Sequence, residues 1–228
     1  MLSGIGTIVG ALAVIYAAHK GSQTFKQWRE RKNEERRIEL AEHVMTLAYK
    51  LRRAIEAVRA EGMLPSENAQ VHDLLVSTGV INDQTPLERI GKLVTAQAAM
   101  SRSNAQKALW DTLLDTMPTA KAIFGDAAET ALNEFWQQRN RVVGAADSYA
   151  KLALEAPPNT ERREAQLDAQ RDRLEAIIWL GGGADGVDAV ASLVDAAVKS
   201  LEDMLLPIIR SDTPFGTKAE SLKASQVE

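Results

Sequence analysis

The chain has 228 residues, a formal net charge of −4 and no cysteine. The lack of cysteine excludes disulfide frameworks, thiolate metal sites and a cysteine nucleophile, and the acidic balance argues against a general nucleic-acid-binding protein. Aromatic residues make up only 5% of the chain. Long runs of Ala, Leu, Glu, Arg and Gln favour helix, because these side chains lose little rotamer freedom there. We therefore expect an all-α protein.

The first predicted element is a transmembrane helix within an anchor of residues 1–21. Residues Leu2–Ala18 carry no charged side chain, and at about 1.5 Å per residue this stretch reaches the lower limit for crossing a bilayer. A cleaved signal peptide would have basic residues before its apolar core, whereas here they follow it. A buried core helix is the other alternative. Gly6 and Gly10 have the GxxxG spacing that lets two membrane helices pack closely, although glycine is also common in membrane helices generally.

A basic cluster follows the uncharged segment. Its members are Lys20, Lys26, Arg29, Arg31, Lys32, Arg36 and Arg37. Because basic flanks stay in the cytoplasm, the cluster predicts an outside N-terminus and a cytoplasmic C-terminal body. It would also favour an anionic cytoplasmic leaflet, unless it is only a topology signal and a solvated helix face.

A long juxtamembrane helix is predicted within residues 22–62. Charge pairs at helical spacing support it, among them Glu34 with Arg37 and Arg31 with Glu35. An apolar stripe recurs at steps of three and four residues, through Leu40, Val44, Leu47, Leu51, Ala54 and Val58. The stripe predicts packing inside the protein's own bundle, with a coiled-coil seam as the alternative.

Residues 63–210 predict a bundle of four to six helices that the long helix completes. The expected helices are residues 66–75, 85–116, 120–124, 126–155, 161–179 and 187–206. We expect Ser66, Thr85 and Asp126 to cap three of them, and Pro118 and Pro207 to end two of them. Residues 211–228 are polar and predict a disordered tail.

The helix over residues 126–155 has an apolar set that we expect to be buried. It comprises Leu132, Phe135, Trp136, Val142 and Val143. A groove beside Trp136, or the Leu40–Val58 stripe, could then serve as a partner surface.

Two motifs suggest chemistry. His43, the pair His72-Asp73, and Asp111 or Asp115 follow the order H…HD…D and resemble HD domains, which are all-helical metal-dependent phosphohydrolases. The resemblance implies that these side chains bind metal ions that activate water against a phosphate ester, although the glycine and lysine usual after the HD pair are missing here. The alternative is that both histidines are ordinary surface residues.

The stretch GGGADG at residues 181–186 matches GxGxxG, but helical flanks instead of a βαβ unit predict a helix–helix turn. We expect no cofactor.

The stretch FKQWRERKNEERRIELAEHVMTLAYKLRRAIEAVRAE resembles the start of uncharacterised bacterial proteins with one membrane anchor and a helical cytoplasmic body. That resemblance implies a bacterial inner-membrane protein and no particular activity. We predict a single-pass, non-catalytic interaction or adaptor protein whose partners are the lipid bilayer and another protein, or a second copy of itself. The alternatives are an HD-type phosphohydrolase, or a phage- or toxin-like protein that acts on the membrane through its glycine-rich helix.

Overall fold

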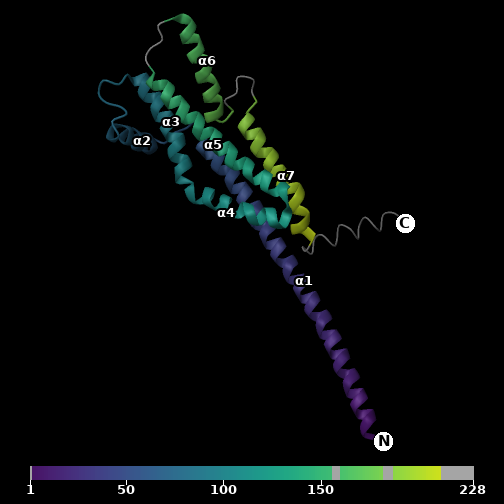
Figure 1. The fold of residues 1–228 in the computed structure, drawn as a ribbon. Helices are drawn as coiled ribbons and strands as arrows, with labels where there is room; N and C mark the ends of the chain where they lie inside the picture. Colours follow the sequence, from purple (N-terminus) through teal and green to yellow (C-terminus); the bar gives the residue numbers. More distant parts are fainter. Residues whose placement is uncertain (1, 156–159, 182–186, 212–228) are drawn as a thin grey trace. The chain divides into compact units, whose positions relative to one another are not determined.

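The computed structural model describes residues 2–155, 160–181 and 187–211, except for the side chains of residues 2–19, 23 and 211. Within these ranges every regular element is a helix, which confirms the all-α prediction. The helices are α1 (Leu2–Val58), α2 (Pro65–Ser77), α3 (Leu87–Ala105), α4 (Lys107–Phe124), α5 (Asp126–Leu154), α6 (Glu161–Ile178) and α7 (Ala189–Ser211) (Figure 1).

The chain divides into two units. The terminal unit comprises residues 1–43 and 208–228, and the bundle unit comprises residues 44–207. The division falls inside α1, so residues 44–58 belong to the bundle unit.

The predicted anchor lies mostly outside the residues whose side chains are described. The backbone of α1 is helical from Leu2 through Gly21 and onward without a break, and Gly6 and Gly10 fall in the part without described side chains. Among the helices that the structure describes, none is long and apolar enough to cross a membrane. Residues 182–186 of the glycine-rich stretch and the tail from residue 212 also lie outside the described residues.

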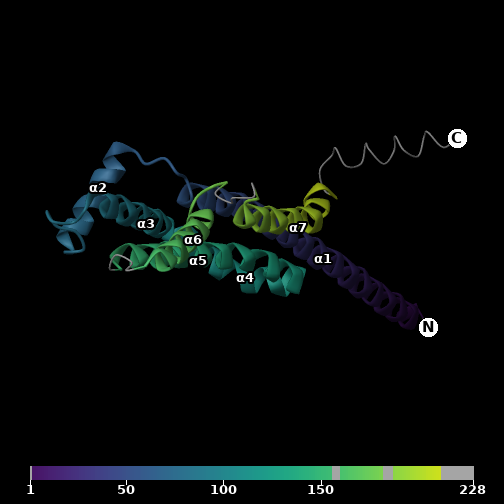
Figure 2. The same ribbon diagram turned by 90° about the horizontal axis from the view of Figure 1, so that it is seen from above.

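The centre of the bundle unit is α5, which runs beside α3, α4 and α6 in both views (Figures 1 and 2). Alanines form much of its contact with α3 and allow the two backbones to approach closely. One buried cluster is made of Ala96, Ala99, Ala145, Ala146, Tyr149 and Ile178. A second cluster joins α2, α3 and the end of α5 through Val71, Leu75, Ile81, Leu93, Val94, Ala98 and Ala153.

The apolar stripe of α1 lies in the interior of the bundle unit. Five of its six members, Val44, Leu47, Leu51, Ala54 and Val58, are each at most 5% exposed, whereas Leu40 is only half-buried and belongs to the terminal unit. From Val44 to Val58 the stripe is therefore covered by helices of the same chain, as predicted. It is not available as a coiled-coil seam or as a docking surface for a partner.

Three predicted helix boundaries were wrong, and the short helix predicted over residues 120–124 is the end of α4. The expected helix over residues 85–116 is two helices, because α3 ends at Ala105 and α4 begins at Lys107. Pro118 lies inside α4 instead of ending it, and Thr116 and Ala120 on either side of it are both buried. Likewise α7 continues through Pro207 to Ser211. Burial of a helix face can outweigh the cost of one lost backbone hydrogen bond at proline.

The predicted caps at Ser66, Thr85 and Asp126 were also wrong. The Oγ1 of Thr85 accepts a hydrogen bond from the backbone N–H of Asn82 at 3.0 Å, so this hydroxyl serves the preceding turn and leaves the start of α3 uncapped. The helix α2 begins before Ser66 and α5 begins at Asp126 itself.

Gly125 ends α4 with a φ of 87°, a conformation that glycine adopts without steric cost.

Candidate binding groove between α5 and α7

Within the bundle unit, the structure does not bring His72, Asp73 and Asp111 or Asp115 of the HD-like pattern together as a metal site. His72 and Asp73 are neighbours on α2 with Nδ1 and Oδ1 3.9 Å apart, His43 is exposed, and Asp111 forms an ion pair with Lys107 one turn earlier on α4. Asp115 is exposed on α4. Among the residues described here, no group of three His, Cys, Asp or Glu side chains could hold a metal ion.

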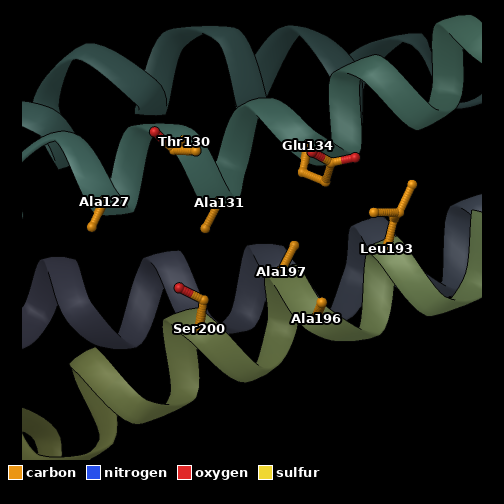
Figure 3. A pocket seen from close by; sticks show the side chains of 8 residues that line it. All are labelled: Ala127, Thr130, Ala131, Glu134, Leu193, Ala196, Ala197 and Ser200. Carbon is orange, nitrogen blue, oxygen red and sulfur yellow. The ribbon is translucent and has the colours of Figure 1, made fainter.

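A groove of about 330 Å³ separates α5 from α7 within the bundle unit (Figure 3). Its α5 wall is formed by Ala127, Thr130, Ala131 and Glu134, and its α7 wall by Leu193, Ala196, Ala197 and Ser200. Each wall has the spacing i, i+3, i+4, i+7, which is one face of a helix over two turns. The groove exists because most of these side chains are too short to fill the space between the two backbones.

The two ends of the groove differ in chemistry. At one end the carboxylate of Glu134 faces Leu193, and at the other Ala127 lies opposite Ser200 (Figure 3). Leu193 is 40% exposed, so it offers an apolar surface at the rim. The Oε1 of Glu134 accepts a hydrogen bond from the Nε2 of the buried Gln138 at 2.6 Å, which holds the carboxylate on the α5 wall.

Contacts with α1 hold the α7 wall in place. The Tyr49 hydroxyl donates a hydrogen bond to Glu202 at 2.8 Å, and Arg52 lies 3.2 Å from Asp195. These polar contacts tie α7 to the part of α1 in the bundle unit, whereas small side chains line α7 where it faces α5.

The start of α7 is fixed by a buried arginine. Arg59 has no solvent exposure, and its guanidinium donates to Oδ2 of Asp188 at 2.8 Å. It also donates to three backbone carbonyls at the end of α6, those of Ala176, Ile177 and Trp179. The guanidinium thus joins the end of α1, the end of α6 and the start of α7.

Asp188 has a second role as the cap of α7. Its Oδ1 accepts the N–H of Ala191 at 2.9 Å, and its Oδ2 accepts the N–H of Gly181 at 2.8 Å. Burial of Asp188 by itself raises the pKa of the carboxyl, but the hydrogen bonds from Arg59, Ala191 and Gly181 outweigh that effect. The pKa of Asp188 therefore lies below its usual value, and the group is ionised at neutral pH.

Arg102 closes the connection between α1 and α2. Its guanidinium makes a two-pronged contact with the Glu67 carboxylate, at 2.5 and 2.8 Å, and also donates to the carbonyls of Ala60 and Gly62. The hydrogen bond from Arg102 lowers the pKa of Glu67. These contacts tie α3 to the start of α2 and to the residues that follow α1.

Trp136 lies outside the lining of the groove. The guanidinium carbon of Arg139 stands 5.1 Å from the centre of the Trp136 ring, and Nε of Arg139 donates to Oγ of the buried Ser103 at 3.0 Å. A cation over one ring face is a favourable contact in itself. The predicted surface beside Trp136 is therefore partly covered by Arg139, and the groove lies on another face of α5.

The basic cluster is placed on exposed helix in the terminal unit. Its seven members are all solvent-exposed along α1. Three of them take part in ion pairs within the helix, Lys26 with Glu30, Lys32 with Glu35 and Arg37 with Glu34. Pairing of Glu34 with Arg37 was predicted from spacing, whereas Glu35 pairs with Lys32 instead of Arg31.

Sequence reasoning missed the groove and the Arg59 cluster. Both depend on residues far apart in the chain, and alanine at i, i+3, i+4 spacing usually indicates a buried face instead of an open one. The sequence did contain one signal for Arg59, its position directly after the buried stripe residue Val58. An arginine buried at such a position is expected to have polar partners, because arginine is rarely buried without them. Its partners could not be named from spacing.

Comparison of the chain with protein-family models, with curated proteins and with solved structures found no match.

Proposed function

We propose that this chain is a membrane-anchored, non-catalytic adaptor whose bundle unit binds a helix of a partner protein in the groove between α5 and α7. The observation that carries the proposal is the groove itself, with two facing walls of short side chains over two turns each. A third helix can lie between two such walls with its apolar face inward, which is the helix-in-groove mode of recognition.

The lining specifies the chemistry of the partner helix. Short or medium apolar side chains at i, i+3 and i+4 would contact Ala131 and Ala197 in the middle of the groove. A lysine or arginine at one end of the same face would meet Glu134, the one acidic residue of the lining. A second copy of this chain and a small apolar molecule are the other occupants that an experiment must distinguish.

The membrane location is supported by the sequence. Leu2–Ala18 carries no charge and is followed directly by Lys20 and the rest of the basic cluster. We therefore place the chain in the bacterial inner membrane, as a single-pass protein with its N-terminus outside and its body in the cytoplasm.

Reporter fusions after Glu228 test the topology. A green fluorescent protein fused there is expected to fluoresce, and alkaline phosphatase at the same position is expected to be inactive, because the phosphatase requires export. Both fusions are also expected to remain with membranes after a carbonate wash. An active phosphatase with a dark fluorescent fusion would reverse the orientation, and release of both by carbonate would remove the anchor.

Cross-linking and binding together test the groove. A photoreactive amino acid at Thr130, on the exposed rim of the α5 wall, is expected to cross-link a partner helix in living cells, while the same label at exposed Asn140, on another face of α5, is not. Binding of that partner to the full chain in detergent is then measured with Ala196→Phe, which fills the groove from an exposed position. We expect at least a tenfold rise in Kd, since the pocket for an anchoring side chain is lost.

The matched control is Lys199→Phe, which places the same side chain at an exposed position on another face of α7, outside the lining. It is expected to leave the Kd unchanged. Equal weakening by both variants, or cross-links only between copies of this chain, would refute a helical partner in this groove.

A further inference from the structure

The exposed part of α1 in the terminal unit has two unlike faces. Phe25, Arg29, Lys32 and Arg36 follow the spacing i, i+4, i+7, i+11, so they share one face, and Trp28 lies beside Phe25. The opposite face carries Lys26, Glu30, Glu34 and Arg37, in which each cation pairs with a glutamate. The first face is hereafter the aromatic–cationic face, and the second is the paired face.

Two large aromatic side chains lie open on the aromatic–cationic face. Phe25 is 62% and Trp28 is 59% exposed, and their ring centres are 5.8 Å apart. Single exposed apolar side chains are common on protein surfaces. Here two aromatic rings are in contact on a helix whose neighbouring residues are otherwise polar. Together they form a small apolar surface, which is more stable in an apolar or interfacial environment than in water.

The cations beside these rings are largely free of internal partners. Arg29 and Arg36 form no ion pair with any residue that the structure describes, and only Lys32 on this face is paired, with Glu35 at 2.9 Å. The face therefore presents aromatic rings flanked by available guanidinium groups. That combination matches the boundary of an anionic bilayer, where aromatic rings settle at headgroup level and cations meet lipid phosphates.

We infer that the aromatic–cationic face of α1 binds the headgroups of anionic lipids. The sequence places the start of this face, Phe25, seven residues after the end of the uncharged stretch Leu2–Ala18. The length of this stretch as a helix is a few ångströms less than the thickness of a typical hydrocarbon core. A span that is too short draws its flanking residues toward the membrane. Charge alone would suit any polyanion, but the aromatic pair and its distance from the uncharged stretch favour lipid over an acidic protein or a nucleic acid.

The inference extends the proposed membrane location and can be tested with the whole chain. Because the protein has no cysteine, Thr24→Cys provides a single site, next to this face, for a nitroxide spin label. The labelled chain is reconstituted into phosphatidylcholine vesicles, or into vesicles with about a third phosphatidylglycerol. Collisions of the label with a water-soluble nickel relaxing agent then report how far it is withdrawn from water.

We expect the label to be less accessible to nickel in the anionic vesicles, and the difference to shrink in high salt. The double variant Arg29→Gln/Arg36→Gln is expected to lower the ratio of withdrawn to exposed label by about fivefold, mainly through Arg29. Arg36 lies seven residues further along α1, about 10 Å farther from the uncharged stretch, where the surface potential is weaker. The control Lys26→Gln/Arg37→Gln makes the same change in charge on the paired face. It is expected to retain the difference between the two kinds of vesicle.

The outcomes separate this inference from the membrane anchor. Equal accessibility in both kinds of vesicle, or equal loss in the two double variants, would overturn lipid binding by this face even if the chain floats with both. Withdrawal of the label that increases with protein density and ignores lipid composition would assign the face to a second copy and overturn it also. Flotation with anionic vesicles alone would support the face and remove the anchor.

Discussion

Replacing Arg59 with methionine is expected to lower the free energy of unfolding by about 3–5 kcal/mol, the usual cost of removing one partner from a buried ion pair. Methionine retains much of the volume, so the loss arises from polar groups and not from a cavity. Asp188, whose side chain is 13% exposed, would keep its charge without the guanidinium, and the carbonyls of Ala176, Ile177 and Trp179 would each lose a donor. The measurement is the urea midpoint of the far-ultraviolet circular dichroism signal.

The matched control is Arg52→Met on the same helix. Arg52 also contacts two carboxylates, those of Glu56 and Asp195, but its side chain is 44% exposed. Exposed pairs contribute about 1 kcal/mol or less, so this variant is expected to move the midpoint little. A loss in Arg59→Met no greater than in Arg52→Met would show that the buried cluster does not hold the three helix ends together.

The pH dependence gives the Arg59 variant a second signature. In the native chain the pKa of Asp188 is lowered, so its contribution to stability is complete above the ordinary aspartate range and is lost as pH falls through the lowered pKa. Without Arg59, burial remains and still raises that pKa. The Asp188 contribution in the variant is therefore expected to disappear at a higher pH than in the native chain.

Replacing Phe135 with alanine is expected to lower the free energy of unfolding by about 3–5 kcal/mol, because a large core side chain is lost and a cavity is left. Phe135 has no solvent exposure and lies on α5, the helix at the centre of the bundle unit. The same urea titration measures the effect. Phe135→Leu, which refills most of the volume, is expected to recover much of the stability.

The adjacent Trp136→Ala is the informative comparison. Trp136 is half-buried, and one of its neighbours is the Arg139 guanidinium, which can turn toward solvent when the ring is removed. We expect its loss of stability to be smaller than that of Phe135→Ala despite the larger ring. An equal or larger loss would mean that the Trp136 side of α5 is as closely packed as the Phe135 side.

These neighbouring aromatics show the limit of sequence periodicity. Both were predicted to be buried, and successive residues on a helix differ by about 100°, so one apolar arc can include both. The arc does not state where the covering helices end. Packing of α5 against its neighbours buries Phe135 completely, and Trp136 is left at the edge of the contact.

The same limit applies to the candidate sites, which the sequence predicted only in part. The charges at residues 20–37 and their helical setting could be read from the sequence, because spacing along one helix determines which side chains share a face. Only the coordinates showed that Phe25 and Trp28 are exposed. They also showed that Glu35 pairs with Lys32 and not with Arg31. The groove had no sequence signal, since alanines that line an open channel and alanines that pack two helices have the same spacing.

By itself the sequence determined the helical class, the position of the basic cluster and the burial of the apolar stripe from Val44 onward. All of these follow from local propensity and from periodicity along a single helix. Only the tertiary structure decided that α4 and α7 continue through their prolines, that Arg59 joins three helix ends, and that α5 and α7 stand apart. Those features depend on contacts between residues distant in the chain, and no spacing within one helix encodes which distant surface will meet it.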